Sequence, residues 1–456
     1  MPNELSTANL LLYGLPFLIV LVIYLYRHRR TESHHAGKLA EAKEAGLTEP
    51  PSLHPVIDPR RCLSSRACVS ACPEKALGII GGKATLVNPA NCIGHGACQA
   101  ACPHDAIELV FGTAKRGMDI PLVKPNFETN VPGLFIAGEL GGMGLIRKAA
   151  EQGRQAMESI AKLKGANGAS RHRAPRLDPI GEGSGLPYDV VIVGAGPAGL
   201  SASLGALEKK LRFVTIEQED AFGGTVYHYP RNKVVMTAPV QLPIVGKMKF
   251  SEVSKERLLE FWQGVIRKTG LKINFSERME TLRPDGKGFV VKTARAEYRT
   301  RAVLLAIGRR GTPRKLEVPG EECAKVVYRL IDAEQYRGQH VLVVGGGDAA
   351  LEAALACSEQ PGTKVALSYR SEAFGRVKPK NRELLQQAHA AGRINVLLSS
   401  TVKSITSHQV ILEQQKRKVE LSNQAVIVCA GGVLPTPFLK EIGIQVDTKF
   451  GTACKL

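Results

Sequence analysis

The feature that most constrains this chain is a cysteine-rich motif that occurs twice, 30 residues apart. Residues 62–73 read CLSSRACVSACP and residues 92–103 read CIGHGACQAACP. Three cysteines and a proline recur at the same places in both runs, which indicates an internal duplication. Interlocked runs of this kind are typical of iron–sulfur ligands, whereas zinc sites use separated pairs of cysteines. Thiolates reserved for iron place the bulk of the chain in a reducing compartment.

The duplicated runs resemble those of bacterial two-cluster ferredoxins, in which the fourth cysteine of each run binds the other cluster. The resemblance implies two clusters with three thiolates each, held by Cys62, Cys68 and Cys102 and by Cys92, Cys98 and Cys72. The family's second cysteine is replaced by Ser65 in the first run and by His95 in the second. Ser65 and His95 are therefore candidate fourth ligands, and 3Fe–4S and 4Fe–4S clusters both remain open.

An apolar run lies near the N-terminus. Residues 10–26 read LLLYGLPFLIVLVIYLY, and basic residues begin directly at Arg27. Seventeen uncharged residues just reach the length that spans hydrocarbon, and a signal peptide would carry its positive charge on the other side. We therefore expect a single-pass anchor in a bacterial inner membrane with the bulk of the chain cytoplasmic, because positive flanks stay inside. A polar linker follows.

A strand of β-branched residues runs into a glycine-rich turn and a helix at 188–199, which read YDVVIVGAGPAG. Such a turn brings backbone N–H groups close to a pyrophosphate at a helix N-terminus, and an acid after the next strand binds a ribose. The segment AFGGTVYHYP at 221–230 favours FAD, since flavoenzymes place backbone there against the flavin. The residues predicted to bind FAD here are Gly194, Gly196, Gly199, Glu217, Gly223 and Gly224. The run Ala306-Ile307-Gly308 resembles the strand that returns the chain from the FAD domain in two-dinucleotide-domain reductases, and this resemblance adds Gly308.

A second strand–turn–helix unit begins after Gln339 with HVLVVGGGDAALEAA. Its turn carries Gly345, Gly347 and Ala350, and its next strand ends in SYR with no acid. Arg370 and Arg376 are predicted to pair with a 2'-phosphate, which favours NADPH over NADH.

Residues 188–450 resemble the thioredoxin-reductase-like flavoproteins of the pyridine nucleotide-disulfide oxidoreductase superfamily. The stretch VVYRLIDAEQYRGQ, where thioredoxin reductase carries a redox-active CxxC, contains no cysteine. The family's closing Gly–acid pair, which bonds the ribityl chain of FAD, is found near the front of this chain as Gly138 and Glu139. The resemblance therefore implies a circularly permuted flavoprotein.

The resemblances together imply an α/β fold with two Rossmann-like domains, a small α+β ferredoxin-like domain and an N-terminal transmembrane helix. The expected order is an anchor (9–27), a linker (28–56), the ferredoxin-like domain (57–112), the permuted end of the FAD domain (113–164), a linker (165–187), the FAD domain (188–317), the NAD(P) domain (318–430) and a return to the FAD domain (431–456).

The expected function is a membrane-anchored NAD(P)H oxidoreductase that moves electrons between NAD(P)H, FAD and two iron–sulfur clusters. Hydride transfer requires no side-chain acid or base, so no catalytic residue is assigned. The partner stays open among a quinone, a cytochrome, a ferredoxin and a small disulfide. A flavin-dependent reductase of a low-molecular-weight disulfide and a tethered redox sensor are the alternatives. The formal charge of +19 fits anionic lipid or an acidic partner, and no nucleic-acid-binding motif accompanies it. The flavoprotein resemblance also allows a homodimer.

Overall fold

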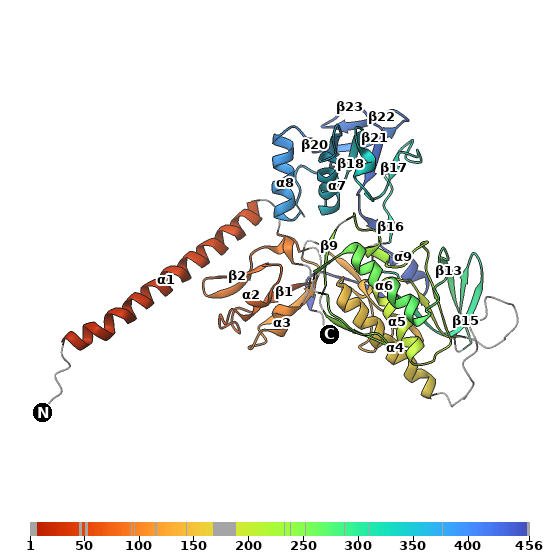
Figure 1. Cartoon of the computed structure of the whole chain (residues 1–456), viewed down its shortest axis with the longest axis horizontal. Helices are drawn as coiled ribbons and strands as arrows, with labels where there is room; N and C mark the ends of the chain where they lie inside the picture. Colours follow the sequence, from red (N-terminus) through yellow and green to blue (C-terminus); the bar gives the residue numbers. More distant parts are fainter. Residues whose placement is uncertain are drawn as a thin grey trace. The chain divides into compact units, whose positions relative to one another are not determined.

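The computed structural model divides the chain into two compact units, residues 1–113 with 451–455 and residues 114–450 (Figure 1). The residues described are 7–44, 48–50, 53–92, 94, 96–114, 116–142, 144–166, 188–231, 233–237, 239–250, 252–286, 288–309, 311–375 and 377–453. The predicted linker at 165–187 therefore lies outside the described residues from 167 onward.

The first unit is built on short strands and two short helices that begin inside the cysteine runs. Its antiparallel sheet has the order β1 (His54–Ile57), β4 (Ile107–Phe111) and β27 (Thr452–Ala453), and a hairpin joins β2 (Leu77–Ile80) to β3 (Lys83–Leu86). The helices are α2 (Ala67–Ala71), α3 (Ala97–Ala100) and the 3-10 turn η1 (Pro89–Asn91). Leu77, Ile79 and Leu109 are almost completely buried, so this small unit has its own core.

Strand β27 departs from the predicted return of residues 431–456 to the FAD domain, whereas residues 431–450 belong to the second unit. Thr452 pairs with Phe111 of β4 in the first unit, while β26 (Val446–Lys449) pairs with β5 (Met118–Pro121) in the second. The last described strand therefore belongs to the ferredoxin-like unit. Backbone hydrogen bonding to an open sheet edge decides this, and a strand of two residues carries no sequence signal for it.

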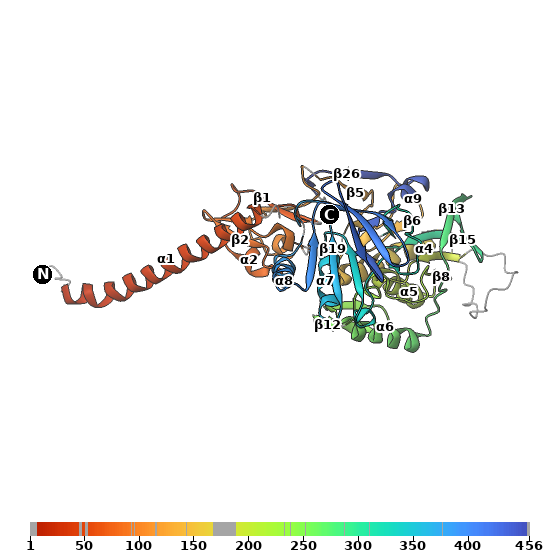
Figure 2. The same ribbon diagram turned by 90° about the horizontal axis from the view of Figure 1, so that it is seen from above.

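The N-terminal helix α1 (Thr7–Glu44), red in Figures 1 and 2, is much longer than the sequence indicated. It is helical through most of the predicted linker at 28–56. Residues 31–44 are rich in good helix formers, and one face of this part packs on the hairpin. His35 contacts the backbone of Ile79, and Glu32 accepts a hydrogen bond from Gly82 N–H at 3.0 Å.

The large apolar side chains of α1 between Leu15 and Tyr26 are all exposed. Among the residues that the structure describes, no helix is long and apolar enough to cross a membrane. The predicted transmembrane helix at 9–27 thus has no support from the described residues. Its apolar run is short, and arginines follow it directly at 27, 29 and 30.

The second unit begins with a mixed sheet whose parallel strands meet at the glycine-rich turn. The strand order is β13-β14-β15-β7-β8, and β6 also pairs with β15. These strands are β6 (Leu134–Ile136), β7 (Tyr188–Val193), β8 (Phe213–Ile216), β13 (Met279–Asp285), β14 (Gly288–Thr293) and β15 (Glu297–Leu305). Residues before the linker therefore complete a sheet formed by residues after it, which is what a circularly permuted order requires.

Two helices lie together on this sheet, α4 (Ile146–Ala166) and α5 (Pro197–Glu208). Gly153 permits their close approach, because a Cβ there would lie 2.1 Å from the carbonyl oxygen of Ala198. Around them lie η2 (Glu139–Gly141), η3 (Gly224–Val226), β9 (Val234–Met236), β10 (Val240–Leu242), β11 (Gly246–Met248), β12 (Glu252–Ser254) and α6 (Lys255–Thr269). Trp262 of α6 is 2% exposed and anchors the core under this layer.

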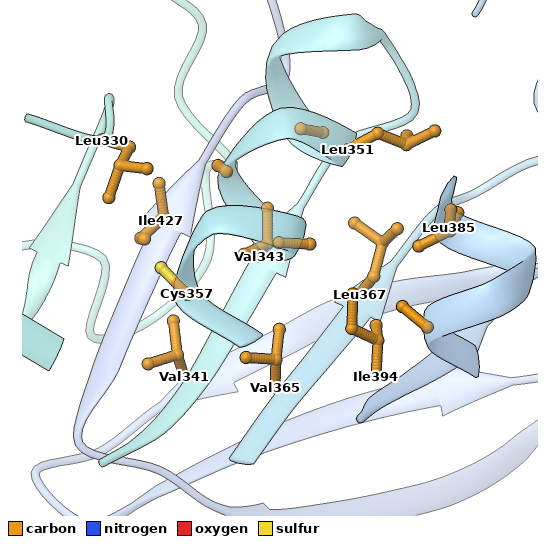
Figure 3. Packing of buried hydrophobic residues seen from close by; sticks show 14 of the residues in the cluster. Leu330, Val341, Val343, Leu351, Cys357, Val365, Leu367, Leu385, Ile394 and Ile427 are labelled. Atoms are coloured by element: carbon orange, nitrogen blue, oxygen red, sulfur yellow. The ribbon is translucent and has the colours of Figure 1, made fainter. Parts of the chain in front are cut away.

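The rest of the second unit contains a second, fully parallel sheet with the order β17-β24-β18-β19-β20. Its elements are β17 (Val326–Val327), β18 (His340–Val344), β19 (Lys364–Ser368), β20 (Ile394–Leu397), β24 (Ala425–Val428), α7 (Asp348–Ser358) and α8 (Pro379–Ala390). Figure 3 shows side chains of these strands facing Leu351 and Cys357 of α7 and Leu385 of α8.

Smaller elements complete this part of the chain. They are β16 (Thr312–Pro313), η4 (Glu334–Tyr336), β21 (Ser400–Ile405), β22 (Gln409–Gln414), β23 (Arg417–Ser422), β25 (Gly432–Val433) and α9 (Thr436–Glu441). Leu439 of α9 and Ile444 pack into the core of the first mixed sheet, so the chain returns there after the second sheet. The α/β part of the predicted fold, with two Rossmann-like sheets, is confirmed.

Candidate redox centres

The six cysteines of the duplicated runs line two cavities in the first unit. Cys62, Cys68 and Cys102 line one cavity, and Cys72, Cys92 and Cys98 line the other. Each cavity therefore takes two cysteines from one run and the last cysteine of the other. This is the grouping that the ferredoxin resemblance implies.

Burial and backbone donors suit these sulfurs for iron. Burial raises the pKa of the Cys92 and Cys98 thiols to about 11 each, and it also raises the pKa of Cys68. A buried thiolate thus needs a cation to offset its desolvation, and iron supplies one. Backbone N–H groups point at the sulfurs in equivalent ways, since Ala76 donates to Cys72 and Ala106 donates to Cys102, both at 3.4 Å. The residues present fit two clusters.

Of the two candidate fourth ligands, Ser65 and His95, the structure describes only Ser65. Ser65 lines the first cavity, while His95 lies outside the described residues. Among the described side chains, no three of His, Cys, Asp or Glu lie close enough together to hold one metal ion. Three charged or titratable residues that sequence reasoning missed also line the cavities, namely Arg66 and His104 at the first and Glu74 at the second. Alignment of the two runs shows that these positions differ in charge, but only the fold shows that they line the cavities.

The first glycine-rich turn has the geometry that a dinucleotide pyrophosphate requires. Gly194 has φ +107°, and a Cβ at Gly199 would lie 1.8 Å from the carbonyl oxygen of Gly194, so no side chain fits there. Gly196 caps the N-terminus of α5, whose first N–H groups have no partner within the helix. This helix start is therefore open to a phosphate group.

Glu217 lies at the end of β8, directly beside this turn. It is buried and accepts hydrogen bonds from Ala195 N–H at 2.6 Å and Glu219 N–H at 3.1 Å. Burial raises the pKa of its carboxyl, and the two backbone donors oppose that shift. A fixed acid in this position fits the ribose hydroxyl groups of a bound dinucleotide.

Two further glycine segments pack against the same turn. Gly223 N–H donates to the Ala195 carbonyl at 2.8 Å, and a Cβ at Gly224 would lie 3.1 Å from Gly196 Cα. Gly138 comes from the permuted segment, and a Cβ there would lie 3.0 Å from Ala198 Cβ of α5. The structure thus brings together predicted site residues that are far apart in the sequence.

The Gly–acid pair has partners that sequence reasoning did not identify. Gln152 of α4 accepts a hydrogen bond from Gly138 N–H at 2.9 Å. Arg309, next to Gly308, donates to the Asp119 carbonyl at 3.0 Å, and burial lowers the pKa of its guanidinium while Glu139 opposes that shift. Gly308 has φ +67° and open space where a Cβ would lie. A half-buried cation thus neighbours the predicted ribityl site.

The second glycine-rich turn is less enclosed. A Cβ at Gly345 would lie 2.4 Å from the Cys429 carbonyl oxygen, but at Gly347, which caps α7, it would meet nothing within 4 Å. Ala350 is fully buried in α7. Arg370 is exposed after β19, and Arg376 lies outside the described residues.

Tyr369 was missed by sequence reasoning. Its ring lies over Gly346 of the second turn, where a Cβ would come within 2.1 Å of it, and it stacks on Phe374 at 5.3 Å between ring centroids. Ser368 before it hydrogen-bonds Ser400 at 2.7 Å. No acid directly follows β19, so this turn offers Arg370 where the first turn offers the buried Glu217.

Comparisons with known proteins agree with this geometry. The family described as pyridine nucleotide-disulphide oxidoreductase matches residues 191–453, and a 4Fe-4S dicluster domain matches residues 54–103. Bacilliredoxin reductase Bdr of Bacillus subtilis is 24% identical over 268 residues, covering 57% of this chain and 82% of that protein. A ferredoxin–NADP reductase of Pediococcus pentosaceus is 30% identical over 231 residues, covering 50% of this chain and 67% of that protein.

A solved structure shares the fold of the second unit. Bacillithiol disulfide reductase Bdr from Bacillus cereus matches with a TM-score of 0.51 and 24% identity, covering 57% of this chain and 83% of that chain. The flavoprotein family matches residues 191–453 and the 4Fe-4S dicluster domain matches residues 54–103, so the two matches do not overlap.

Proposed function

Because this chain belongs to the pyridine nucleotide-disulphide oxidoreductase family, we propose that it oxidises NAD(P)H and passes the electrons singly to a redox partner through its own ferredoxin-like unit. It is an FAD- and iron–sulfur-dependent oxidoreductase. The observation that carries the proposal is the presence, in one chain, of two glycine-rich dinucleotide turns and two cavities with three cysteines each.

FAD, when bound, accepts two electrons as a hydride and can release them singly, whereas each cluster carries one. The protein's part is to bind and orient these groups. Gly194 to Gly199 hold a pyrophosphate against the start of α5, and Glu217 fixes a ribose. Arg370, exposed after β19, is proposed to pair with the 2'-phosphate of NADPH.

Anaerobic stopped-flow reduction of the reconstituted protein by NADPH, with EPR on samples frozen at successive times, tests the proposal. We expect the flavin absorbance to bleach first and cluster signals to grow afterwards. Cys98→Ala should remove one cluster signal, while Cys323→Ala, whose thiol lines neither cysteine cavity, should leave both. The proposal fails if the flavin is reduced while both clusters stay oxidised.

The second candidate is a reductase of a low-molecular-weight disulfide at the flavin. Two of the similar proteins are named as reductases of bacilliredoxin and of bacillithiol disulfide. Basic and aromatic side chains gather after Gly224, where Arg329 contacts His228 and Lys255 Nζ lies 5.8 Å from the Tyr227 ring centroid. Turnover of a small disulfide with both clusters oxidised would favour this candidate over the first. A tethered redox sensor is the third candidate, and no observation on the described residues favours it.

We also propose that α1 attaches the protein to the bacterial inner membrane, with the rest of the chain on the cytoplasmic side. Its exposed apolar side chains from Leu15 to Tyr26 support contact with lipid, since a soluble surface rarely carries so large an apolar patch. The full chain should float with anionic vesicles. The pair Leu18→Glu and Val22→Glu should abolish flotation, and Ser33→Glu should not.

The partner and the assembly state complete the proposal. A quinone or a cytochrome suits a protein held at a membrane, and a ferredoxin suits the relatives that are named as its reductases. A homodimer is proposed on the family resemblance alone. Light scattering of the full chain in detergent would test it, and a monomer at micromolar concentration would refute it.

A further inference from the structure

The two cysteine-lined cavities are built from the same backbone and can be compared position by position. Ser64 and Arg66 have φ of 58° and 62°, and their counterparts Gly94 and Gly96 have φ of 78° and 74°. The short helices α2 and α3 begin at the same point of each run. Differences in chemistry between the cavities therefore come from side chains.

Two described positions that line the cavities differ in charge in the same direction. Arg66 lines the first cavity where the second has Gly96. His104 lines the first cavity where its counterpart Glu74 lines the second. Arg66 lies two positions before Cys68, and His104 lies two positions after Cys102. These two differences between the runs make the surroundings of the first cavity more positive than those of the second.

Arg66 is fixed beside its cavity. A side chain is disfavoured at positive φ, and the second run avoids this with glycine. The Arg66 guanidinium donates to His28 Nδ1 of α1 at 2.8 Å, and because arginine can only donate, Nδ1 is the acceptor. The other ring nitrogen of His28 lies 3.7 Å from Glu32 Oε1, and the ring stacks on Tyr24. These contacts hold the positive charge near the cavity.

We propose that the cluster held by Cys62, Cys68 and Cys102 has the higher reduction potential, so that an electron entering the ferredoxin-like unit settles there. Reduction adds negative charge to a cluster, which a nearby cation stabilises and a nearby carboxylate opposes. In this step the cluster held by Cys72, Cys92 and Cys98 loses one electron and the other gains it. No proton moves and no bond forms.

This assignment gives the unit a direction. An electron that enters the ferredoxin-like unit at either cluster is then collected at the cavity whose Arg66 contacts α1. A one-electron acceptor would then be reduced from the first cavity. The inference rests on the proposed function only in requiring that both clusters are bound.

An EPR-monitored redox titration of the full, reconstituted chain tests the inference. We expect the first electron to favour one cluster by at least about tenfold, which is about 59 mV for a one-electron couple. Arg66→Gly and His104→Glu install the residues of the second run and should lower the potential of that signal alone. Glu74→His should raise the potential of the other signal alone.

A matched control is Arg60→Gly, which removes a nearby arginine whose side chain is 91% exposed, and it should shift neither signal. If Arg66→Gly prevents cluster assembly, His104→Glu still decides the question because it leaves the loop backbone unchanged. Clusters that titrate together, or a high-potential signal that responds to Glu74→His, would overturn the assignment. Iron and sulfide contents below two clusters per chain would overturn the proposed function. Two bound clusters with the opposite order of potentials would overturn only this assignment, so the two failures are distinguishable.

Discussion

The two glycine-rich turns of the second unit share one pattern but differ in how much of the chain surrounds them. The first turn, at Gly194 to Gly199, is enclosed by Glu217, by the Gly223–Gly224 segment and by Gly138 of the permuted segment. The second turn has open space at Gly347 and an aromatic ring over Gly346. A shared strand–turn–helix motif thus sets where a pyrophosphate binds, and the neighbouring segments decide which dinucleotide it is and how firmly it is held.

The largest expected effect comes from filling the closest contact in the first turn. Gly199→Ala should abolish FAD binding, because the new Cβ would lie 1.8 Å from the Gly194 carbonyl oxygen. The change Gly347→Ala in the second turn, at the position equivalent to Gly196, should leave the flavin content unchanged, because its Cβ meets nothing within 4 Å. Flavin absorbance per chain measures both. Equal losses in the two variants would refute the contrast between enclosed and open turns.

The next effect concerns the acid of the first turn. Glu217→Gln removes a charged hydrogen-bond acceptor, which is worth about 1.5–3 kcal/mol, so FAD should bind roughly 10- to 150-fold more weakly. Asp220→Asn changes an exposed acid three residues away and serves as the control. Flavin fluorescence titration of the FAD-free protein gives both dissociation constants. Unchanged FAD affinity in Glu217→Gln would show that this acid does not bind the ribose.

The third effect concerns Arg370, the predicted 2'-phosphate ligand beside the second turn. Arg370→Ala should raise KM for NADPH about tenfold or more, as expected for one charged hydrogen bond, and leave KM for NADH nearly unchanged. Arg393→Ala, an exposed arginine in the same part of the chain, is the control. Steady-state reduction of a dye acceptor reports both constants. A parallel rise for both nucleotides would place Arg370 away from the 2'-phosphate.

The smallest expected effect is a change with pH in the free energy of unfolding, caused by Glu217 beside the first turn. The second turn has no equivalent buried acid directly after its strand. Burial raises the pKa of Glu217, so the folded FAD-free protein binds this proton more tightly than the unfolded chain does. Stability should therefore fall as pH rises from the unfolded pKa through the folded pKa. Glu217→Gln has no proton to lose in this range, so its free energy of unfolding should change less with pH there. Urea unfolding at several pH values measures it, and identical slopes would contradict it.

Sequence patterns predicted the elements whose signal is local. The glycine turns and the parallel strands follow from spacing and β-branched runs, and the cysteine grouping followed from a resemblance that the cavities match. What the patterns missed depends on tertiary contacts. Helix α1 continues to Glu44 because one face of a polar segment packs on the hairpin, and Tyr369 covers Gly346 only after its strand is placed. Arg66 and His104 became visible as cavity residues only in the folded loop.

The pairing of β27 with β4 makes the ferredoxin-like unit discontinuous in the chain. The flavoprotein part is in effect an insertion into it, joined by two covalent crossings rather than one. During synthesis the edge of β4 stays unpaired with β27 until the whole inserted part has emerged from the ribosome. Deletions that separate the units with a single cut would therefore strip one strand from the cluster-bearing sheet, whereas excising the insertion and bridging Thr113 to Gly451 would keep that sheet whole.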